Sequence, residues 1–208
     1  MARKSNTEAR RAEITGALLT VIARHGYDKA TIQAIAKQAG LAPGLIHYHF
    51  KSKQEILVSL IEAMAKAASA RYAAVQGDAV EPLTRLRAYL QARLGLGDGA
   101  APDIVAAWVM IGAEAVRQAE VRVVYRGMIA DELTLLTTLV EDCLRAASRD
   151  ATAAGTLAAG LVAMIEGAYQ LSSAAPEVMP RGYAADAATA YAELRIAAAT
   201  PIPASPAS

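Results

Sequence analysis

The chain has 208 residues, of which 54% are hydrophobic but only 5% aromatic, and its formal net charge is +1. Its single cysteine excludes an intrachain disulfide and a cysteine-based zinc site. The sequence has no run of about 18 uncharged apolar residues, and its N-terminus lacks the apolar core of a signal peptide. We therefore expect a soluble, cytoplasmic protein whose alanine-rich core consists of closely packed helices.

The first predicted helix covers residues 7–24, where apolar residues recur at steps of three and four. It lies in a basic segment, because residues 1–53 carry nine lysines and arginines against three acidic residues, a net charge of +6. The remainder of the chain carries twelve basic and seventeen acidic residues, a net charge of −5. A basic segment of this kind is either a solvated surface or a surface that attracts phosphates.

The pattern of residues 31–50 predicts two short helices around a glycine turn. Thr31 is suited to the N-cap of the first helix, and Gly40 can adopt the positive φ that the following turn requires. Pro43 suits the first turn of the second helix, where its missing N–H group would be unpaired in any case. Two short helices joined in this way form a helix-turn-helix, which indicates DNA binding.

The second short helix carries exposed polar aromatic groups. His47, Tyr48 and His49 are consecutive, so at least two of them must point away from the face that Leu45, Ile46 and Phe50 anchor. Aromatic groups that can hydrogen-bond, next to lysines, suit phosphates and base edges.

The rest of the chain shows helical periodicity and no convincing strand. Ser52 and Glu55 form a capping box at the start of a fourth helix, which should run to about residue 75. Residues 95–102 form the clearest loop, and the proline-rich residues 200–208 are expected to be disordered. Further helices are predicted over residues 82–94, 103–118, 121–147, 151–172 and 183–198.

The helix-turn-helix region resembles the TetR-type bacterial transcriptional repressors, sharply so over residues 10–60. At two positions it departs from them: Ala42 stands where they often have serine, so it offers no side-chain donor to a phosphate, and His47 stands where they frequently have tyrosine. A weaker likeness to the betaine-synthesis-repressor branch lies in Trp108, residues 125–144 and 165–168. The residues that carry the sharper resemblance are Gly40, Leu41, Gly44, Leu45, Ile46, Tyr48, Phe50, Ser52, Lys53 and Leu57.

The resemblance implies an all-α fold, with an N-terminal three-helix DNA-binding unit followed by a C-terminal helical ligand-binding and dimerisation domain. We assign residues 1–50 to the first domain, 51–199 to the second and 200–208 to the tail. The implied function is a repressor that binds a palindromic operator in duplex DNA as a homodimer and is released by a small molecule. Two recognition helices about one DNA turn apart, roughly 34 Å, would read the two half-sites.

The DNA contacts are predicted from the motif and its charge. Phosphate contacts are expected from Thr31, Tyr48 and Lys53, assisted by Lys51 and by a basic arm at Arg3 and Lys4, while the second short helix approaches the bases. The predicted DNA-binding residues are Thr31, Gly44, Leu45, His47, Tyr48, Lys51 and Lys53.

The predicted helix over residues 151–172 is apolar on more than one side, so it belongs to a core or to a subunit interface. The resemblance favours the interface, and a purely intrachain core is the alternative. The interface residues expected on this helix are Leu157, Leu161, Met164, Ile165 and Ala168.

A ligand would lie inside the helical body according to the resemblance. Glu114 interrupts an apolar run, so it either faces inward and needs a partner or pairs with Arg117 or Gln118 on the surface. The resembling branch suggests choline or betaine, but the residues themselves do not identify the effector. The expected ligand-binding residues are Trp108, Ile111, Glu114, Tyr125, Met128, Ile129 and Tyr169.

Two other classes of function are alternatives to a ligand-responsive repressor. For an enzyme, the sequence has no nucleophile elbow, phosphate loop or zinc-binding helix, and His47 and His49 diverge by about 200° on a helix. Glu132, Glu141 and Asp142 have the spacing of a solvated face, so we predict no catalytic residue, cofactor or metal. The second rival is a constitutive DNA-binding repressor or a helical interaction module without a small-molecule ligand.

Overall fold

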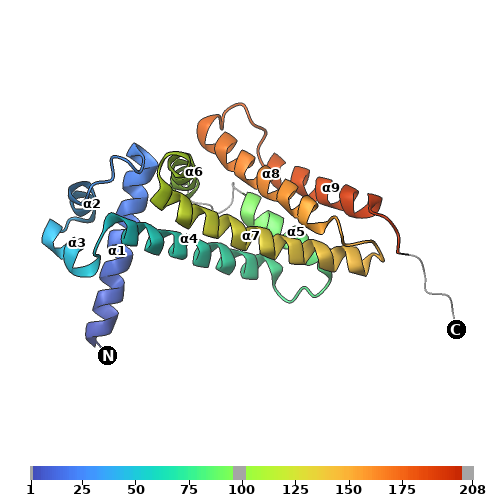
Figure 1. The fold of residues 1–208 in the computed structure, drawn as a ribbon, viewed down its shortest axis with the longest axis horizontal. Coiled ribbons are helices and arrows are strands. Elements are labelled where there is room, and N and C mark those ends of the chain that lie inside the picture. The colour runs from blue at the N-terminus through green and yellow to red at the C-terminus, as the bar shows by residue number, and fades with distance from the viewer. Residues whose placement is uncertain (1, 96–101, 203–208) are drawn as a thin grey trace. The chain divides into compact units, whose positions relative to one another are not determined.

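The computed structural model describes residues 2–95 and 102–202, with side chains from residue 7 onward. Every regular element within these residues is a helix, which confirms the all-α prediction (Figure 1). The predicted loop at 95–102 falls largely on residues 96–101, which lie outside the described part. The helices are α1 (Ala2–His25), α2 (Ile32–Ala39), α3 (Pro43–His49), α4 (Lys53–Gln76), α5 (Pro82–Leu94), α6 (Pro102–Arg117), α7 (Ala119–Ala146), α8 (Ala154–Ala174) and α9 (Tyr183–Ala198).

The chain forms two compact units, and these do not follow the expected boundary at residue 50. Unit 1 consists of Met1–Ala67 with Ala100–Met128, and unit 2 of Ala68–Gly99 with Ile129–Ser208. The start of α4 and the whole of α6 therefore group with the helix-turn-helix. One long helix and two short ones bury too little apolar surface to form a very stable unit, and α6 supplies part of what they lack.

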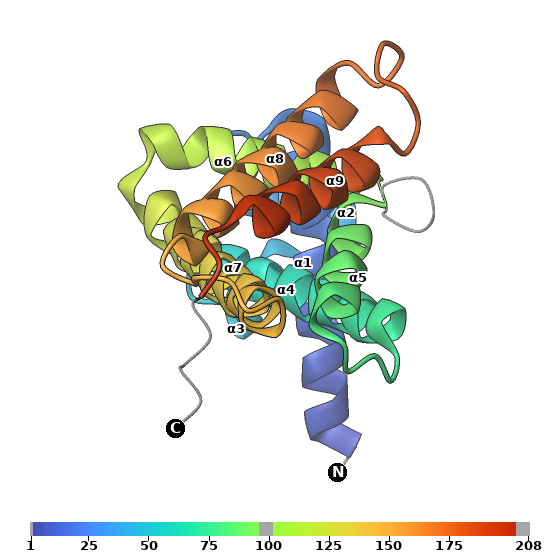
Figure 2. The same ribbon diagram turned by 90° about the vertical axis from the view of Figure 1, so that its right-hand side faces the viewer.

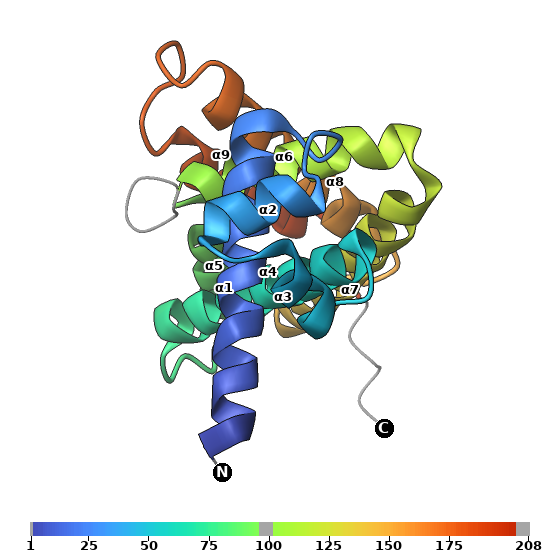
Figure 3. The ribbon, with the colours of Figure 1, turned by 90° about the vertical axis from the view of Figure 1, so that its left-hand side faces the viewer.

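Unit 1 is built around α1, against which α2, α3 and α6 all pack (Figure 3). The apolar stripe predicted on α1 faces this core, and α6 adds Ala107, Ile111 and Ala115 to it. The largest fully buried side chains of the unit are Ile14, Leu18, Ile22, Tyr27, Ile35, Ile46, Phe50, Ile56, Leu57 and Leu60.

Unit 2 contains α5, α8 and α9, with the end of α4 and most of α7. α8 and α9 lie side by side (Figure 2). Gly160 of α8 lies against Tyr191 of α9, and a Cβ atom there would lie 2.9 Å from the Tyr191 hydroxyl oxygen, so a larger residue would require this side chain to shift. The core is made of aliphatic residues and alanines, among them Leu86, Leu90, Leu136, Val140, Leu157, Leu161, Ile165, Ala188 and Ala192.

The segment after α9 corrects one expectation. Residues 200–202 are not free, because the Asp150 amide donates to the Thr200 carbonyl (2.8 Å) and the Ile202 amide donates to the Ser148 carbonyl (3.0 Å). Arg149 also donates from Nη1 to the Ala199 carbonyl (2.9 Å). The turn after α7 thus holds this segment by main-chain pairing, which composition does not reveal. Residues 203–208 lie outside the described part.

None of the described helices is both long and apolar enough to span a bilayer.

Candidate functional site

The helix-turn-helix forms through the local signals that predicted it. The Thr31 hydroxyl oxygen accepts a hydrogen bond from the Ala34 amide (3.1 Å), which caps α2. Gly40 has φ of 66°, and the Leu41 amide donates to the Ala36 carbonyl (2.9 Å) to close the end of that helix. The chain then turns directly into α3. The predicted cap and turn are both confirmed.

α3 presents the predicted polar aromatic face. Ile46 and Phe50 are buried, whereas Gly44 and His47 are exposed and Tyr48 is 72% exposed. Leu45 and His49 are half-buried. The His49 ring lies edge-on to the Tyr48 ring with centroids 5.0 Å apart, which limits the freedom of the exposed tyrosine. Ala42, the N-cap residue of α3, makes no side-chain hydrogen bond, because its methyl group has no acceptor.

Thr31 and Lys51 are exposed, but Lys53 has a second role that the sequence did not reveal. Its Nζ donates to the Tyr27 carbonyl (3.2 Å) and lies 4.0 Å above the Tyr27 ring. Burial, followed by the charges of Glu120 and Glu114, raises the pKa of Tyr27 to about 12. The two contacts of Lys53 with Tyr27 hold the start of α4 against the turn after α1. Removing Lys53 would disturb this turn as well as any phosphate contact.

The basic arm is only partly visible. The backbone of residues 2–6 belongs to α1, so the helix starts earlier than the predicted residue 7. The side chains of Arg3 and Lys4 lie outside the described part.

The predicted capping box at the start of α4 is formed in part, because the return bond of Glu55 goes to the Lys51 amide instead of the Ser52 amide. The Glu55 amide donates to the Ser52 hydroxyl oxygen (3.2 Å), and the Glu55 carboxylate accepts from the Lys51 amide (2.7 Å). The bond from the Lys51 amide, followed by the hydrogen bond from Arg11, lowers the pKa of Glu55. This carboxylate thus stays charged at neutral pH and holds the junction between α3 and α4.

Arg11 is a residue of this site that sequence analysis counted only as charge. It is half-buried on α1 and reaches the end of α3 as well as α4. A signal was available, because Arg11 lies three residues before Ile14 and seven before Leu18. It therefore shares the inward face of α1 with them.

The expected ligand-binding residues divide between the two units. In unit 1, Trp108 is buried with its ring 4.9 Å from that of Tyr125, and Ile111 belongs to the core; Met128 is half-buried. Glu114 is only 8% exposed and accepts a hydrogen bond from Gln118 Nε2 (2.8 Å). Glu114 is therefore buried, as the first alternative required, but its partner is Gln118, which the surface alternative had named.

In unit 2, Ile129 is half-buried and Tyr169 is buried in a polar cluster that sequence analysis missed. Arg93 and Glu132 form a two-pronged ion pair, with Nε–Oε1 at 2.9 Å and Nη2–Oε2 at 3.0 Å. Tyr89 donates to the same carboxylate (2.8 Å), and Tyr169 donates to the Arg93 carbonyl (3.0 Å).

The placement of Glu132 on a solvated face is therefore wrong, because its side chain is 8% exposed. Arg93 also lies 5.4 Å from the Tyr169 ring centroid, so its guanidinium is held by both an anion and an aromatic face. The signal that could have revealed the cluster is Tyr89 and Arg93, four residues apart on one face of α5.

A groove of about 590 Å³ lies in unit 2 near this cluster. Its wall includes Leu94, which follows Arg93, and Ser172, whose hydroxyl donates to the Tyr169 carbonyl (3.0 Å). None of the expected ligand-binding residues lines it. The other lining residues belong to the connection between α8 and α9 and to the start of α9: Pro176, Glu177, Met179, Pro180, Arg181, Gly182, Tyr183 and Ala184.

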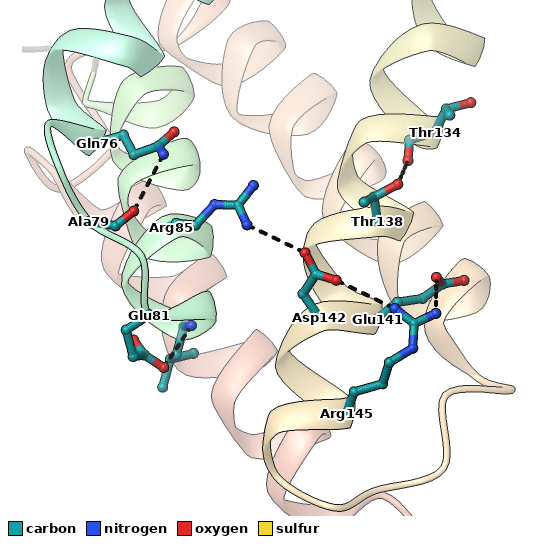
Figure 4. Close-up of polar contacts among 10 residues, drawn as sticks. Gln76, Ala79, Glu81, Arg85, Thr134, Thr138, Glu141, Asp142 and Arg145 are labelled. Atoms are coloured by element: carbon teal, nitrogen blue, oxygen red, sulfur yellow. Dashed lines mark hydrogen bonds and ion pairs between the residues drawn. The ribbon is translucent and has the colours of Figure 1, made fainter.

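Glu141 and Asp142 behave as their spacing predicted. Both pair with Arg145, at 2.7 Å and 3.4 Å, and Asp142 also lies 3.4 Å from Arg85 Nη1 (Figure 4). The Arg145 side chain is 59% exposed. This group is an ordinary surface ion-pair network, in contrast to the buried pair of Arg93 and Glu132.

The residues expected at a subunit interface on α8 are mostly internal. Leu161 and Ile165 have no exposed surface in a single chain, Leu157 and Ala168 are nearly as buried, and only Met164 is half-buried. Helix α8 packs against α5 and α9 within unit 2. Helical periodicity shows that a helix is apolar on several sides but not which neighbour covers each side.

Two family models match the chain. Residues 14–60 match the model described as bacterial regulatory proteins of the tetR family, and residues 82–197 match the C-terminal model of BetI-type transcriptional repressors. The HTH-type transcriptional regulator BetI of Rhizobium meliloti is 32% identical over 163 residues, which are 77% of this chain and 76% of that protein. The BetI regulator of Agrobacterium fabrum is 30% identical over 160 residues, 77% of this chain and 75% of its own.

Solved structures share the fold. A TetR-family transcriptional regulator from Rhodococcus sp. aligns with a TM-score of 0.80 at 20% identity, over 90% of this chain and 99% of its own. A transcriptional regulator from Saccharomonospora viridis, solved in complex with choline, aligns with a TM-score of 0.76 at 22% identity, over 89% and 96%. With the helix-turn-helix in place, one family model matching the segment that contains it and a second matching most of the chain after it, the chain belongs to the TetR family of bacterial DNA-binding transcriptional repressors, with a BetI-type C-terminal region.

Proposed function

We propose that this regulator binds a palindromic operator as a homodimer and releases it when a small molecule binds in unit 2. DNA binding is proposed because Gly44, His47 and Tyr48 form an exposed row on α3, next to the exposed Lys51. Leu45 would pack against bases at the edge of this row, and Tyr48 would reach a base edge as well as a phosphate. Thr31, Lys51 and Lys53 would contact phosphates.

Loss of a base contact and loss of a phosphate contact should change DNA binding in different ways. Tyr48→Ala should weaken binding to a duplex selected from a random library by about 10- to 100-fold, because a base-edge contact is lost. Lys51→Ala should weaken binding to all duplexes about equally and reduce the log–log salt slope by about 0.9, since one phosphate neutralisation is lost. Fluorescence anisotropy at several salt concentrations measures both effects.

Two matched variants serve as controls. Tyr48→Phe keeps the ring and removes only the hydroxyl, and Lys66→Ala removes the same charge from an exposed position along α4. If the Lys66 and Lys51 variants have the same salt slope, Lys51 is not a phosphate contact. A wild-type protein that enriches no duplex from the library would refute the DNA interface as a whole.

The dimer would use the outward surface of α8 and α9 instead of the internal residues of α8. Ala159, Ala163 and Gly167 are exposed on α8, and Met164 lies beside them. On α9, Ala190 is exposed and Leu194 is 69% exposed. Small side chains let the helices of two chains approach closely. An exposed leucine such as Leu194 gains stability when a partner subunit covers it.

The effector site is proposed at the groove beside Tyr89, Arg93, Glu132 and Tyr169. Its volume of about 590 Å³ lies in the usual range of small-molecule sites. The residues that line the groove include the carboxylate of Glu177 and the aromatic ring of Tyr183, a combination that suits an organic cation. Choline is the first compound to test, because it is the ligand of the Saccharomonospora viridis regulator.

The effector should act reciprocally with DNA. If choline weakens operator binding about 100-fold, it must favour the non-binding conformation by about 2.7 kcal/mol, and the operator must weaken choline binding by the same factor. Calorimetric titration of choline into the protein with and without saturating operator measures this.

The neutral analogue 3,3-dimethyl-1-butanol, which has nearly the shape of choline but no charge, is the control and should bind far more weakly. Equal choline dissociation constants with and without operator would contradict the release mechanism and indicate a constitutive repressor. Binding of the neutral analogue as tight as that of choline would exclude a cation site.

A further inference from the structure

Arg11 of α1 makes an unusually complete set of contacts with the end of α3. Its Nη1 donates to the main-chain carbonyl of His49, the last residue of α3. Its guanidinium carbon lies 3.9 Å from the centroid of the Phe50 ring, which is the residue that ends the helix. A cation at a helix C-terminus pairs with an otherwise unsatisfied carbonyl and with the negative end of the helix dipole.

The same guanidinium also reaches α4. Nη1 and Nη2 each lie 3.3 Å from Glu55 Oε1, and Nη2 donates to the Ser59 hydroxyl oxygen (3.2 Å). The second oxygen of Glu55 accepts from the Lys51 amide (2.7 Å). Arg11 and Glu55 together therefore hold both sides of the junction between α3 and α4, one through the last carbonyl of α3 and the other through the amide of Lys51.

The recognition helix needs such support. α3 has only seven residues, and its N-cap residue Ala42 contributes no side-chain hydrogen bond. A helix of two turns is not stable by itself, so its orientation depends on outside contacts. Ile46 and Phe50 fix its buried side, and Arg11 fixes its end, one residue from Tyr48 and two from His47.

We infer that Arg11 is a positioning residue for operator recognition, which orients α3 and the α3–α4 junction without itself contacting DNA. Its side chain is 34% exposed, and both terminal nitrogens are engaged within the protein. This inference rests on the proposed DNA interface of α3. It extends that interface by assigning part of its sequence specificity to a residue behind it.

The test compares two adjacent arginines. Arg11→Ala should weaken binding to the selected operator by about 10- to 100-fold, because charged hydrogen bonds that hold α3 are lost. Binding to an unrelated duplex and the salt slope should change no more than in Arg10→Ala. Arg10 is the matched control, since it has the same charge and its side chain, 44% exposed, pairs with its neighbour Glu13 on the same helix.

Arg11→Lys provides a second variant in case Arg11→Ala folds poorly. It keeps the charge and the aliphatic stem, but one ammonium group cannot reach the His49 carbonyl, Glu55 and Ser59 with the same fork geometry. Operator binding should therefore still fall, with an unchanged salt slope. Equal loss of affinity for the operator and the unrelated duplex in either variant would make Arg11 a phosphate contact and overturn the inference.

Amide hydrogen exchange separates this inference from the DNA interface. Arg11→Ala should increase exchange at the Phe50 and Lys51 amides, while the amides of α2 exchange as in Arg10→Ala. If the wild-type protein selected no duplex, the proposed interface would fail, and exchange would still decide whether Arg11 orders α3. Unchanged exchange at Phe50 and Lys51 would refute the positioning role.

Discussion

Replacing Arg93 with alanine should lower the free energy of unfolding by about 3–5 kcal/mol, because the carboxylate of Glu132 would remain buried without its partner. The side chains of Arg93 and Glu132 are 16% and 8% exposed, and among the residues that the structure describes Tyr89 would still donate a hydrogen bond to the carboxylate. The Tyr89 hydroxyl cannot neutralise a carboxylate that is so little exposed to water. Urea denaturation followed by circular dichroism measures the loss.

Arg145→Ala is the matched control for this prediction. Arg145 also pairs with carboxylates of α7, but its side chain is 59% exposed, so its loss should cost less than about 1 kcal/mol. The double variant Arg93→Met with Glu132→Leu should recover most of the stability, since no unpaired charge remains. If Arg93→Ala costs no more than Arg145→Ala, water must reach Glu132 in solution.

Leu194→Glu should convert the proposed dimer into monomers and reduce operator affinity by about 10²- to 10⁴-fold. Leu194 is 69% exposed, so the charge costs little in the isolated chain but would be buried in the dimer. A monomer binds one half-site and loses the effective concentration that links the second recognition helix to the first. Sedimentation velocity and anisotropy on the same samples measure both consequences.

Val80→Glu is the control, because Val80 is 88% exposed just before α5 and lies outside α8 and α9. It should remain a dimer with unchanged operator affinity. A Leu194→Glu protein that stays dimeric at micromolar concentration would rule out the α9 surface as the interface. Leu161→Glu would not be informative, since Leu161 is fully buried within one chain and its substitution would damage the core of unit 2.

Interactions that act over a few residues were predictable from the sequence alone. Thr31 caps α2, Gly40 takes positive φ and Ser52 caps α4, because these choices depend on the residue and its immediate neighbours. The helices of the chain followed from periodicity for the same reason. The outward direction of His47 and Tyr48 also followed, since the three consecutive residues 47–49 span about 200° of the helix and cannot all lie on its anchored face.

Contacts between distant residues were decided only by the tertiary structure. Arg11 meets His49 across 38 positions and Arg93 meets Glu132 across 39, and neither pairing has a local signature. In the same way, periodicity predicted an apolar α8, but only packing placed Leu161 and Ile165 inside a single chain. The sequence pattern shows which side chains are stabilised by burial or by an opposite charge. The partner that satisfies each of them is determined by how the helices pack.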